Sequence, residues 1–173
     1  MTRVAVVGHV EWVEFVRVER FPPPGAVTHA LDAFIHAGGG AVVAAVVLAQ
    51  LGADVDFFCA LGRDAAGQAA AEQLAQWGVG VQAAWREEPT RRVVTLLEPG
   101  GERTIITIGE RLQPRGADEL DWARLDGAAG VYFTAGDAGA AGHARRAQTL
   151  VSTPRAREAL AGGAASVDAL VFS

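Results

Sequence analysis

The chain has 173 residues, of which 50% are hydrophobic, and its formal net charge at pH 7 is -5. This length suits one domain with a substantial core, and the modest charge argues against a nucleic acid or a membrane surface as a partner. No apolar run reaches the roughly 18–20 residues of a membrane span, the N-terminus shows no signal-peptide pattern, and the lone Cys59 fits a reducing compartment, so we expect a cytoplasmic protein.

The first half of the chain alternates between predicted strands and helices. A buried strand over 3–7 precedes a strand over 10–20 in which apolar and charged residues alternate, and Phe21-Pro22-Pro23-Pro24-Gly25 then breaks the structure. Further along we expect an almost wholly apolar helix over 40–51, a buried strand over 55–61, an amphipathic helix over 68–77 and an extended segment over 79–85.

The second half begins with a hairpin, since strands over 91–98 and 103–108 flank the turn residues Pro99-Gly100-Gly101-Glu102. Beyond it we expect a helix over 118–125, a strand over 130–134, a helix over 142–150, a strand over 151–154, a helix over 155–161 and a strand over 169–172. This alternation predicts an α/β fold with a parallel sheet flanked by helices. The strands near 10–20 and 91–108 predict a small antiparallel lid over the strand ends, where such sheets bind ligands.

Residues 38–67 carry most of the information about function. Gly38-Gly39-Gly40 opens the apolar helix, which ends at Leu51-Gly52, and the next strand leads into Gly62-Arg63-Asp64-Ala65-Ala66-Gly67. Glycines at a helix start let a ligand approach N–H groups that suit an oxyanion or a hydroxyl, although glycines alone also fit a flexible loop. Neither a G-x-G-x-x-G turn after the first strand nor a Gly-Lys-Ser or Gly-Lys-Thr loop is present, which excludes the dinucleotide and P-loop motifs.

The order and spacing of these residues resemble the first signature of the ribokinase-like (PfkB) carbohydrate kinases, which is written GG-x-x-x-N-x-A…LG…G-x-D-x-x-G. The resemblance spans essentially the whole chain, including the hairpin residues Gly101-Glu102-Arg103-Thr104-Ile105 and the strand before Gly136-Asp137. It implies a Rossmann-like three-layer fold with a lid, and phosphoryl transfer from MgATP to a hydroxymethyl group of a sugar or nucleoside. ATP and Mg²⁺ are the implied cofactors.

The resemblance also implies a set of substrate-binding positions, which are His9, Glu11, Gly38, Gly39, Gly40, Val43 and Asp137. His9 stands where the family has its first acidic residue, and Val43 stands where the family has an asparagine that helps to hold the sugar. Glu11 can supply the missing carboxylate, because a carboxylate accepts hydroxyl hydrogen bonds well; the alternative is that Glu11 and Glu14 are solvated lid residues.

Other polar positions remain open between binding and structural roles. Asp137 either contacts substrate or caps the following helix, and we expect Asp64 to cap the helix that begins near Ala65. Thr153 is a candidate nucleotide-binding residue. The arginines of the hairpin region either bind phosphate or are simply solvated. His9 has no second ligand at a useful spacing, so we expect no metal site.

The family's second signature, D-T-x-G-A-G-D, is absent from this sequence. That signature supplies the catalytic base and most of the ATP site. We therefore interpret residues 1–173 as the N-terminal part of one ribokinase-like domain, with the C-terminal part of the fold missing and no catalytic residue present. The alternative function is a catalytically inactive fragment or paralogue that binds a small molecule or forms a homodimer through the lid. We expect the chain alone to lack kinase activity, and ATP turnover well above blank would contradict this.

Overall fold

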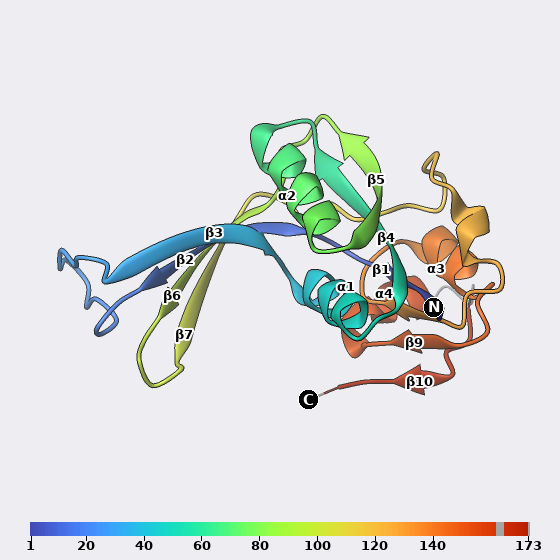
Figure 1. The fold of residues 1–173 in the computed structure, drawn as a ribbon. Coiled ribbons are helices and arrows are strands. Elements are labelled where there is room, and N and C mark those ends of the chain that lie inside the picture. Colours follow the sequence, from blue (N-terminus) through green and yellow to red (C-terminus); the bar gives the residue numbers. More distant parts are fainter. Residues whose placement is uncertain (162–164, 173) are drawn as a thin grey trace.

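The computed structural model describes residues 1–161 and 165–172, which form two sheets (Figure 1). The main sheet has six strands in the order β10-β9-β8-β1-β4-β5, and every pairing in it is parallel. Its strands are β1 (Arg3–Val7), β4 (Asp54–Gly62), β5 (Val79–Arg86), β8 (Gly130–Phe133), β9 (Leu150–Ser152) and β10 (Ala169–Leu170). The predicted parallel α/β sheet is therefore confirmed.

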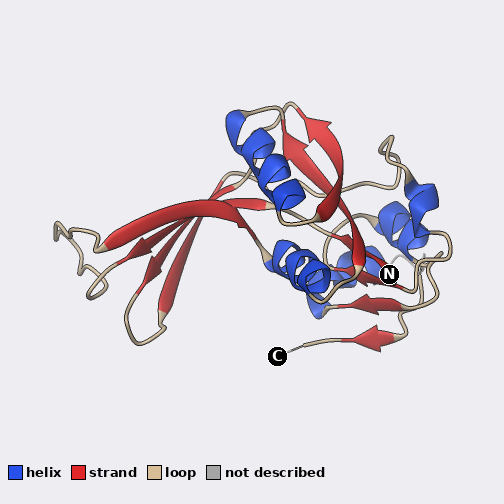
Figure 2. Ribbon diagram, in the orientation of Figure 1, coloured by secondary structure: helices blue, strands red, loops and turns tan. Residues whose placement is uncertain are grey.

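Helices cover both faces of this sheet (Figure 2). Val6 packs in a cluster with residues of α1 (Gly40–Gln50) and α2 (Ala65–Gln76). Its neighbours Ala5 and Val7 pack in a second cluster with α3 (Ala138–Ala144), α4 (Arg157–Ala161) and the 3-10 helix η1 (Trp122–Leu125). Because successive side chains of a strand point to opposite faces, β1 has to be apolar at each of these positions.

The second sheet is the lid, with the strand order β3-β2-β6-β7. It consists of β2 (Glu11–Arg17), β3 (Asp32–Gly38), β6 (Arg92–Leu97) and β7 (Arg103–Ile108), and it projects from one side of the main sheet (Figure 1). The predicted hairpin is confirmed as the antiparallel β6–β7 pair; β2–β3 is also antiparallel, and β2–β6 is parallel.

Strand β3 was not predicted. Residues 32–35 are all exposed, so the strand lacks the alternation of buried and solvated residues that marks a one-sided strand in a sequence. The strand predicted over 10–20 is shorter in the structure and ends at Arg17, although Val18 still donates a backbone hydrogen bond to Leu97.

The helix predicted over 142–150 is wrong. Helix α3 covers Ala138–Ala144 and begins directly after Asp137, whose side chain accepts a hydrogen bond from the Ala140 N–H. Leu150 instead belongs to β9, where it pairs with Val131 of β8. A buried leucine in a parallel strand and one on a helix look alike in a short apolar run.

Smaller differences concern the ends of elements. Helix α2 starts at Ala65 rather than at 68, only the 3-10 helix η1 forms within 118–125, and the 3-10 helix η2 (Pro154–Ala156) precedes α4. The strand expected over 151–154 is β9, and β10 is confined to two residues. Within the part of the chain that the structure describes, no helix is long and apolar enough to cross a membrane. Cys59 is fully buried, and this burial raises the pKa of its thiol to about 12, which makes the thiol unreactive.

Candidate functional site

A cavity of about 460 Å³ lies between the lid and the carboxyl ends of the main-sheet strands. The core contributes His9 after β1, Gly39 and Gly40 at the start of α1, Thr134 after β8 and Thr153 after β9. The lid and its flanking residues contribute Glu11, Arg91, Ile105, Thr107 and Arg111. Open parallel sheets bind ligands at this edge, because the strand ends and the helix N-termini converge there.

Glycines bring the backbone close together on the core side of the cavity. A Cβ on Gly8 would clash with the Thr134 hydroxyl and lie 2.5 Å from the Ala41 Cβ, so only glycine lets β1, β8 and α1 meet at this point. Gly39 has a φ of 101°, a conformation that favours glycine. Because α1 has no side-chain cap and no acidic residue in its first turn, its N–H groups remain available at the cavity wall.

Glu11 is the one carboxylate among the side chains that line the cavity as the structure describes them. Its Oε1 lies 3.6 Å from His9 Nε2 and 3.6 Å from Arg91 Nη1. The His9 ring lowers the pKa of the Glu11 carboxyl, burial raises it, and the charges of Arg91 and Arg111 lower it further, with a net shift below the ordinary value. Glu11 is therefore an ionised hydrogen-bond acceptor at neutral pH.

Two polar atoms beside Glu11 are buried and have no hydrogen-bond partner among the described residues. They are His9 Nδ1 and Arg91 Nε. Buried polar groups in native proteins are normally paired, so these two atoms are exceptions, and both belong to side chains that line the cavity.

The second glycine motif, over residues 62–67, fixes the position of Arg91 through the residue that precedes it. The Asp64 carboxylate accepts hydrogen bonds from the Gly67 N–H (2.8 Å), the Thr90 N–H (2.9 Å) and the Thr90 hydroxyl (2.8 Å). The Gly62 N–H in turn donates to Thr90 Oγ1 at 2.9 Å. Thr90 directly precedes Arg91, so this cluster of hydrogen bonds, which we name the Asp64 cluster, ties the start of the lid hairpin to the end of β4.

The Asp64 cluster confirms the predicted capping role of Asp64 and adds a role that the sequence did not reveal. A Cβ on Gly67 would clash with the Gly62 carbonyl oxygen, and a Cβ on Gly62 would lie 2.5 Å from the Thr90 backbone nitrogen. The glycines of this motif therefore permit close backbone packing.

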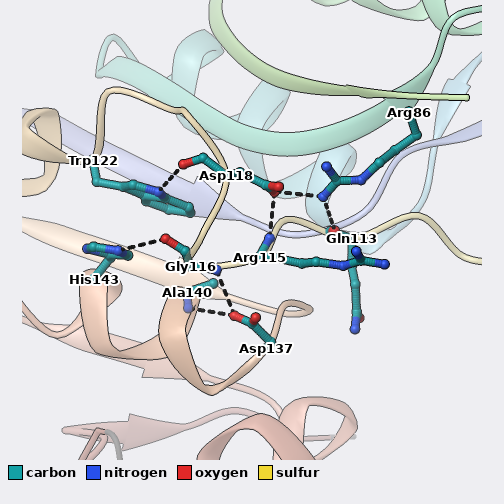
Figure 3. Close-up of polar contacts among 9 residues, drawn as sticks. All are labelled: Arg86, Gln113, Arg115, Gly116, Asp118, Trp122, Asp137, Ala140 and His143. Carbon is teal, nitrogen blue, oxygen red and sulfur yellow. Dashed lines mark hydrogen bonds and ion pairs between the residues drawn. The ribbon is translucent and has the colours of Figure 1, made fainter.

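Asp137 lies outside the cavity and caps α3. Its Oδ1 accepts hydrogen bonds from the N–H groups of Ala140 and Gly116, each at 2.8 Å (Figure 3). His143 Nε2 lies 3.1 Å from the Gly116 carbonyl oxygen, so both ends of α3 hold the segment that follows the lid (Figure 3). Asp118 fixes the same segment to the main sheet through a 2.7 Å ion pair with Arg86.

The structure brings most, though not all, of the predicted binding positions to the cavity. His9, Glu11, Gly39, Gly40 and Thr153 line it. Gly38 packs beneath it, where a Cβ would lie 2.6 Å from the Val13 side chain. Val43 is 60% exposed and does not line the cavity.

Other lining residues were missed or left undecided by the sequence, among them Thr134, Arg91 and Arg111. Thr134 is the first residue after β8, so its place at the strand end was the available signal. Arg91 and Arg111 flank the hairpin, and the sequence could not distinguish them from its solvated arginines, because only the three-dimensional lid turns these two toward the cavity.

No group of three or more histidine, cysteine, aspartate or glutamate side chains gathers at a common point in residues 1–161 and 165–172.

Comparisons with known proteins agree with this architecture. The sequence model of the pfkB family carbohydrate kinase matches residues 1–144. Ribokinase from Arabidopsis thaliana is 33% identical over 126 residues, which are 70% of this chain and 32% of that protein. The structure of Arabidopsis thaliana ribokinase complexed with ribose and ATP has a TM-score of 0.67 at 24% identity, over 90% of this chain and 55% of that one.

A ribokinase from Cryptococcus neoformans var. grubii serotype A in complex with ADP gives the same TM-score, 0.67, at 23% identity over 89% of this chain and 51% of that one. The chain thus spans about a third of the curated relative and about half of the solved structures that it matches. Since the family match covers most of its length, the chain belongs to the pfkB family of carbohydrate kinases.

Proposed function

We propose that this chain is the N-terminal, acceptor-binding part of a sugar or nucleoside kinase, which transfers a phosphoryl group from ATP to a hydroxymethyl group. The observation that carries the proposal is the ionised Glu11 at a cavity between strand ends, a helix N-terminus and a lid. The family membership and the ribokinase relatives support the same reaction class.

In this proposal the residues of the chain bind and orient the acceptor. Glu11 accepts hydrogen bonds from hydroxyl groups, and a bond to an ionised acceptor is about twice as strong as one between neutral groups. The N–H groups of Gly40 and Ala41 donate to an acceptor oxygen from the other side. The lid residues Ile105 and Thr107 cover the bound molecule and exclude water.

The residues of this chain that suit ATP lie at the edge of the cavity next to the end of β9. Thr153 and Arg155 line that edge at the end of β9, and their hydroxyl and guanidinium groups suit a phosphate. When bound, ATP supplies the phosphoryl group.

One observation favours an additional role as a homodimerising module, which was the alternative function. Ile35 and Ile106 occupy one row across the lid sheet, together with Glu14 and Val94, and both isoleucines are about half exposed. Ile108 adds a third exposed isoleucine on the same face of β7. We propose that this face of the lid, on which exposed isoleucines lie on either side of Glu14 and Val94, contacts a second copy of the chain.

The acceptor-binding proposal is tested by titrating the purified chain with neutral and acidic monosaccharides and nucleosides in a calorimeter. Saturable binding of at least one sugar is expected. Glu11→Gln is expected to weaken that binding about 10- to 100-fold, because hydrogen bonds to an ionised group contribute about 1.5–3 kcal/mol.

The matched control is Glu14→Gln. Glu14 lies on the same strand, β2, but on its opposite face and outside the cavity, so its substitution removes the same charge without touching the ligand. Circular dichroism establishes that both variants are folded. If no sugar or nucleoside binds, or if the two variants weaken binding equally, the proposal is wrong.

A further inference from the structure

The charge of the cavity is unbalanced in favour of cations. Among the described residues, three arginines line it, Arg91, Arg111 and Arg155, against one carboxylate, that of Glu11. The N-terminus of α1 adds a partial positive charge, with no acidic residue in its first turn to offset it. A ligand made only of hydroxyl groups would leave this positive charge to be balanced by Glu11 and solvent alone, whereas an anionic group would pair with it.

Two of these arginines stand at the two ends of one hairpin. Arg91 directly precedes β6, and Arg111 follows β7 by three residues. Because Arg92 pairs with Ile108, the ends of the hairpin lie side by side. The backbone of Arg91 is fixed there, since its carbonyl accepts a 2.9 Å hydrogen bond from Trp12, and the Asp64 cluster holds the preceding residue.

The same place contains the unpaired donor already described. Arg91 Nη1 lies 3.6 Å from Glu11, while its buried Nε has no hydrogen-bond partner among the described residues. A guanidinium group carries five N–H donors in a planar fork that matches a carboxylate or phosphate. Glu11 therefore uses only part of the capacity of Arg91, and Arg111 contributes a second guanidinium group to the same cavity.

We propose that the acceptor bound by this chain carries a negative group, a carboxylate or a phosphate, which Arg91 and Arg111 hold at the base of the lid. This inference rests on the proposed function and specifies its substrate class: Glu11 and the start of α1 bind the hydroxyl end of the molecule, and the two arginines bind its anionic end. The acceptor is an acidic sugar rather than a neutral one.

The phosphates of ATP are the other source of a negative group, and the geometry separates the two. Arg155 and Thr153 follow β9, which lies two strands from β1, a distance of about 10 Å at the usual spacing of strands. Arg91 instead contacts Glu11, on the acceptor side. We therefore assign Arg155 to the nucleotide edge, and Arg91 and Arg111 to the acceptor.

The test uses pairs of probes that share a carbon skeleton. D-glucitol and D-gluconate form one pair, and D-fructose and D-fructose 6-phosphate form another; inorganic phosphate and ATP are titrated separately. The acidic member of at least one pair is expected to bind about tenfold or more tightly than the neutral member. Raising the salt concentration from about 0.05 to about 0.5 M is expected to weaken only the acidic member.

Arg111→Gln is the informative variant, because Arg111 is exposed and its substitution leaves the core intact. It is expected to reduce the preference for the acidic sugar about tenfold. The control is Arg103→Gln, which removes the same charge at the other end of the same hairpin, outside the cavity, and is expected to leave the preference unchanged.

The outcomes separate this inference from the proposed function. Binding of neutral sugars alone would overturn the inference and leave acceptor binding intact. Loss of ATP or inorganic phosphate binding in Arg111→Gln, with sugar binding unchanged, would also overturn it, because the arginines would then serve the nucleotide. Absence of binding by every sugar would overturn both.

Discussion

Close contact between β1, β8 and α1 at the cavity end of the main sheet depends on Gly8. It follows β1, and its missing side chain leaves room for Thr134 and Ala41, which lie after β8 and within α1. Thr134 also lines the cavity, so the contact determines both the packing and the shape of the site.

We therefore expect Gly8→Ala to destabilise the protein by about 1–3 kcal/mol, the usual cost of forcing a methyl group into a packed interior. Urea denaturation followed by Trp fluorescence measures this. Gly100→Ala is the control, because a Cβ there meets nothing within 4 Å and the residue lies in a turn. Equal midpoints for the two variants would show that the Gly8 contact is not tight.

At the scale of single residues, the sequence could assign a candidate role only where that role follows from the neighbouring residues in the chain. His9, Glu11, Gly39 and Gly40, which the resemblance implied as binding positions, line the cavity because they follow a strand end or start a helix. Val43 was placed by its position in a motif alone, and the structure leaves it 60% exposed and away from the cavity. Arg91 and Arg111 could not be assigned, because their meeting depends on a hairpin that closes over 20 residues.

Among the elements, the junction of β4, α2 and the lid hairpin depends on one carboxylate. Burial raises the pKa of Asp64, but hydrogen bonds from Gly67 and Thr90 lower it more, so its net pKa lies below the ordinary value of 3.8. A carboxyl whose pKa is lower in the folded state stabilises the protein above its unfolded-state pKa, and this contribution is lost as the pH falls through the folded-state value.

Asp64→Asn is thus expected to lower the free energy of unfolding by about 1–3 kcal/mol at pH 7, through loss of charge-assisted hydrogen bonds. The difference between the wild type and the variant is expected to shrink as the pH falls below about 4, when the Asp64 carboxyl of the unfolded and then of the folded chain is protonated. Denaturation curves at pH 7, 5 and 3 measure it. A difference that stays constant with pH would contradict the role of the ionised carboxylate.

Predictions of elements succeeded where burial gave a clear pattern. Strands β1 and β4 were found because they are largely buried and end at or beside a glycine, and α1 was found because an apolar run lies between glycines, although Val43 and Val47 of this helix are exposed. Strand β3 was missed because its first four residues are exposed at the lid, and α3 was misplaced because its alanines carry little amphipathic signal beside Leu150 of the next strand. Both errors concern residues that form a strand by pairing with a neighbouring strand, and a single sequence does not display that pairing.

The whole molecule consists of a main sheet with two helical layers and a lid that extends away from it (Figure 1). Several apolar side chains of the lid have no covering element, and Ile35, Ile106 and Ile108 are about half exposed. Exposed apolar side chains that gather on one face of a sheet mark a surface for interaction with another molecule.

We expect the chain to be a dimer in light scattering after size-exclusion chromatography, and Ile106→Asp to convert it to a monomer, because a buried unpaired charge disfavours association. Val27→Asp is the control, since Val27 is 89% exposed in the loop between β2 and β3 and lies outside the row. A monomeric wild type, or a dimer that survives Ile106→Asp, would exclude the lid as the contact.

The connection between the lid and α1 has a mechanical consequence. Strand β3 ends at Gly38 and α1 begins at Gly40, so Gly39 is the one residue between them. Any tilt of the lid is therefore either absorbed by rotation about the backbone bonds of Gly39 or passed on to the first turn of α1. In the second case the end of α1 that lines the cavity turns with the lid, so a tilt of the lid also changes the direction in which the N–H groups of that turn point.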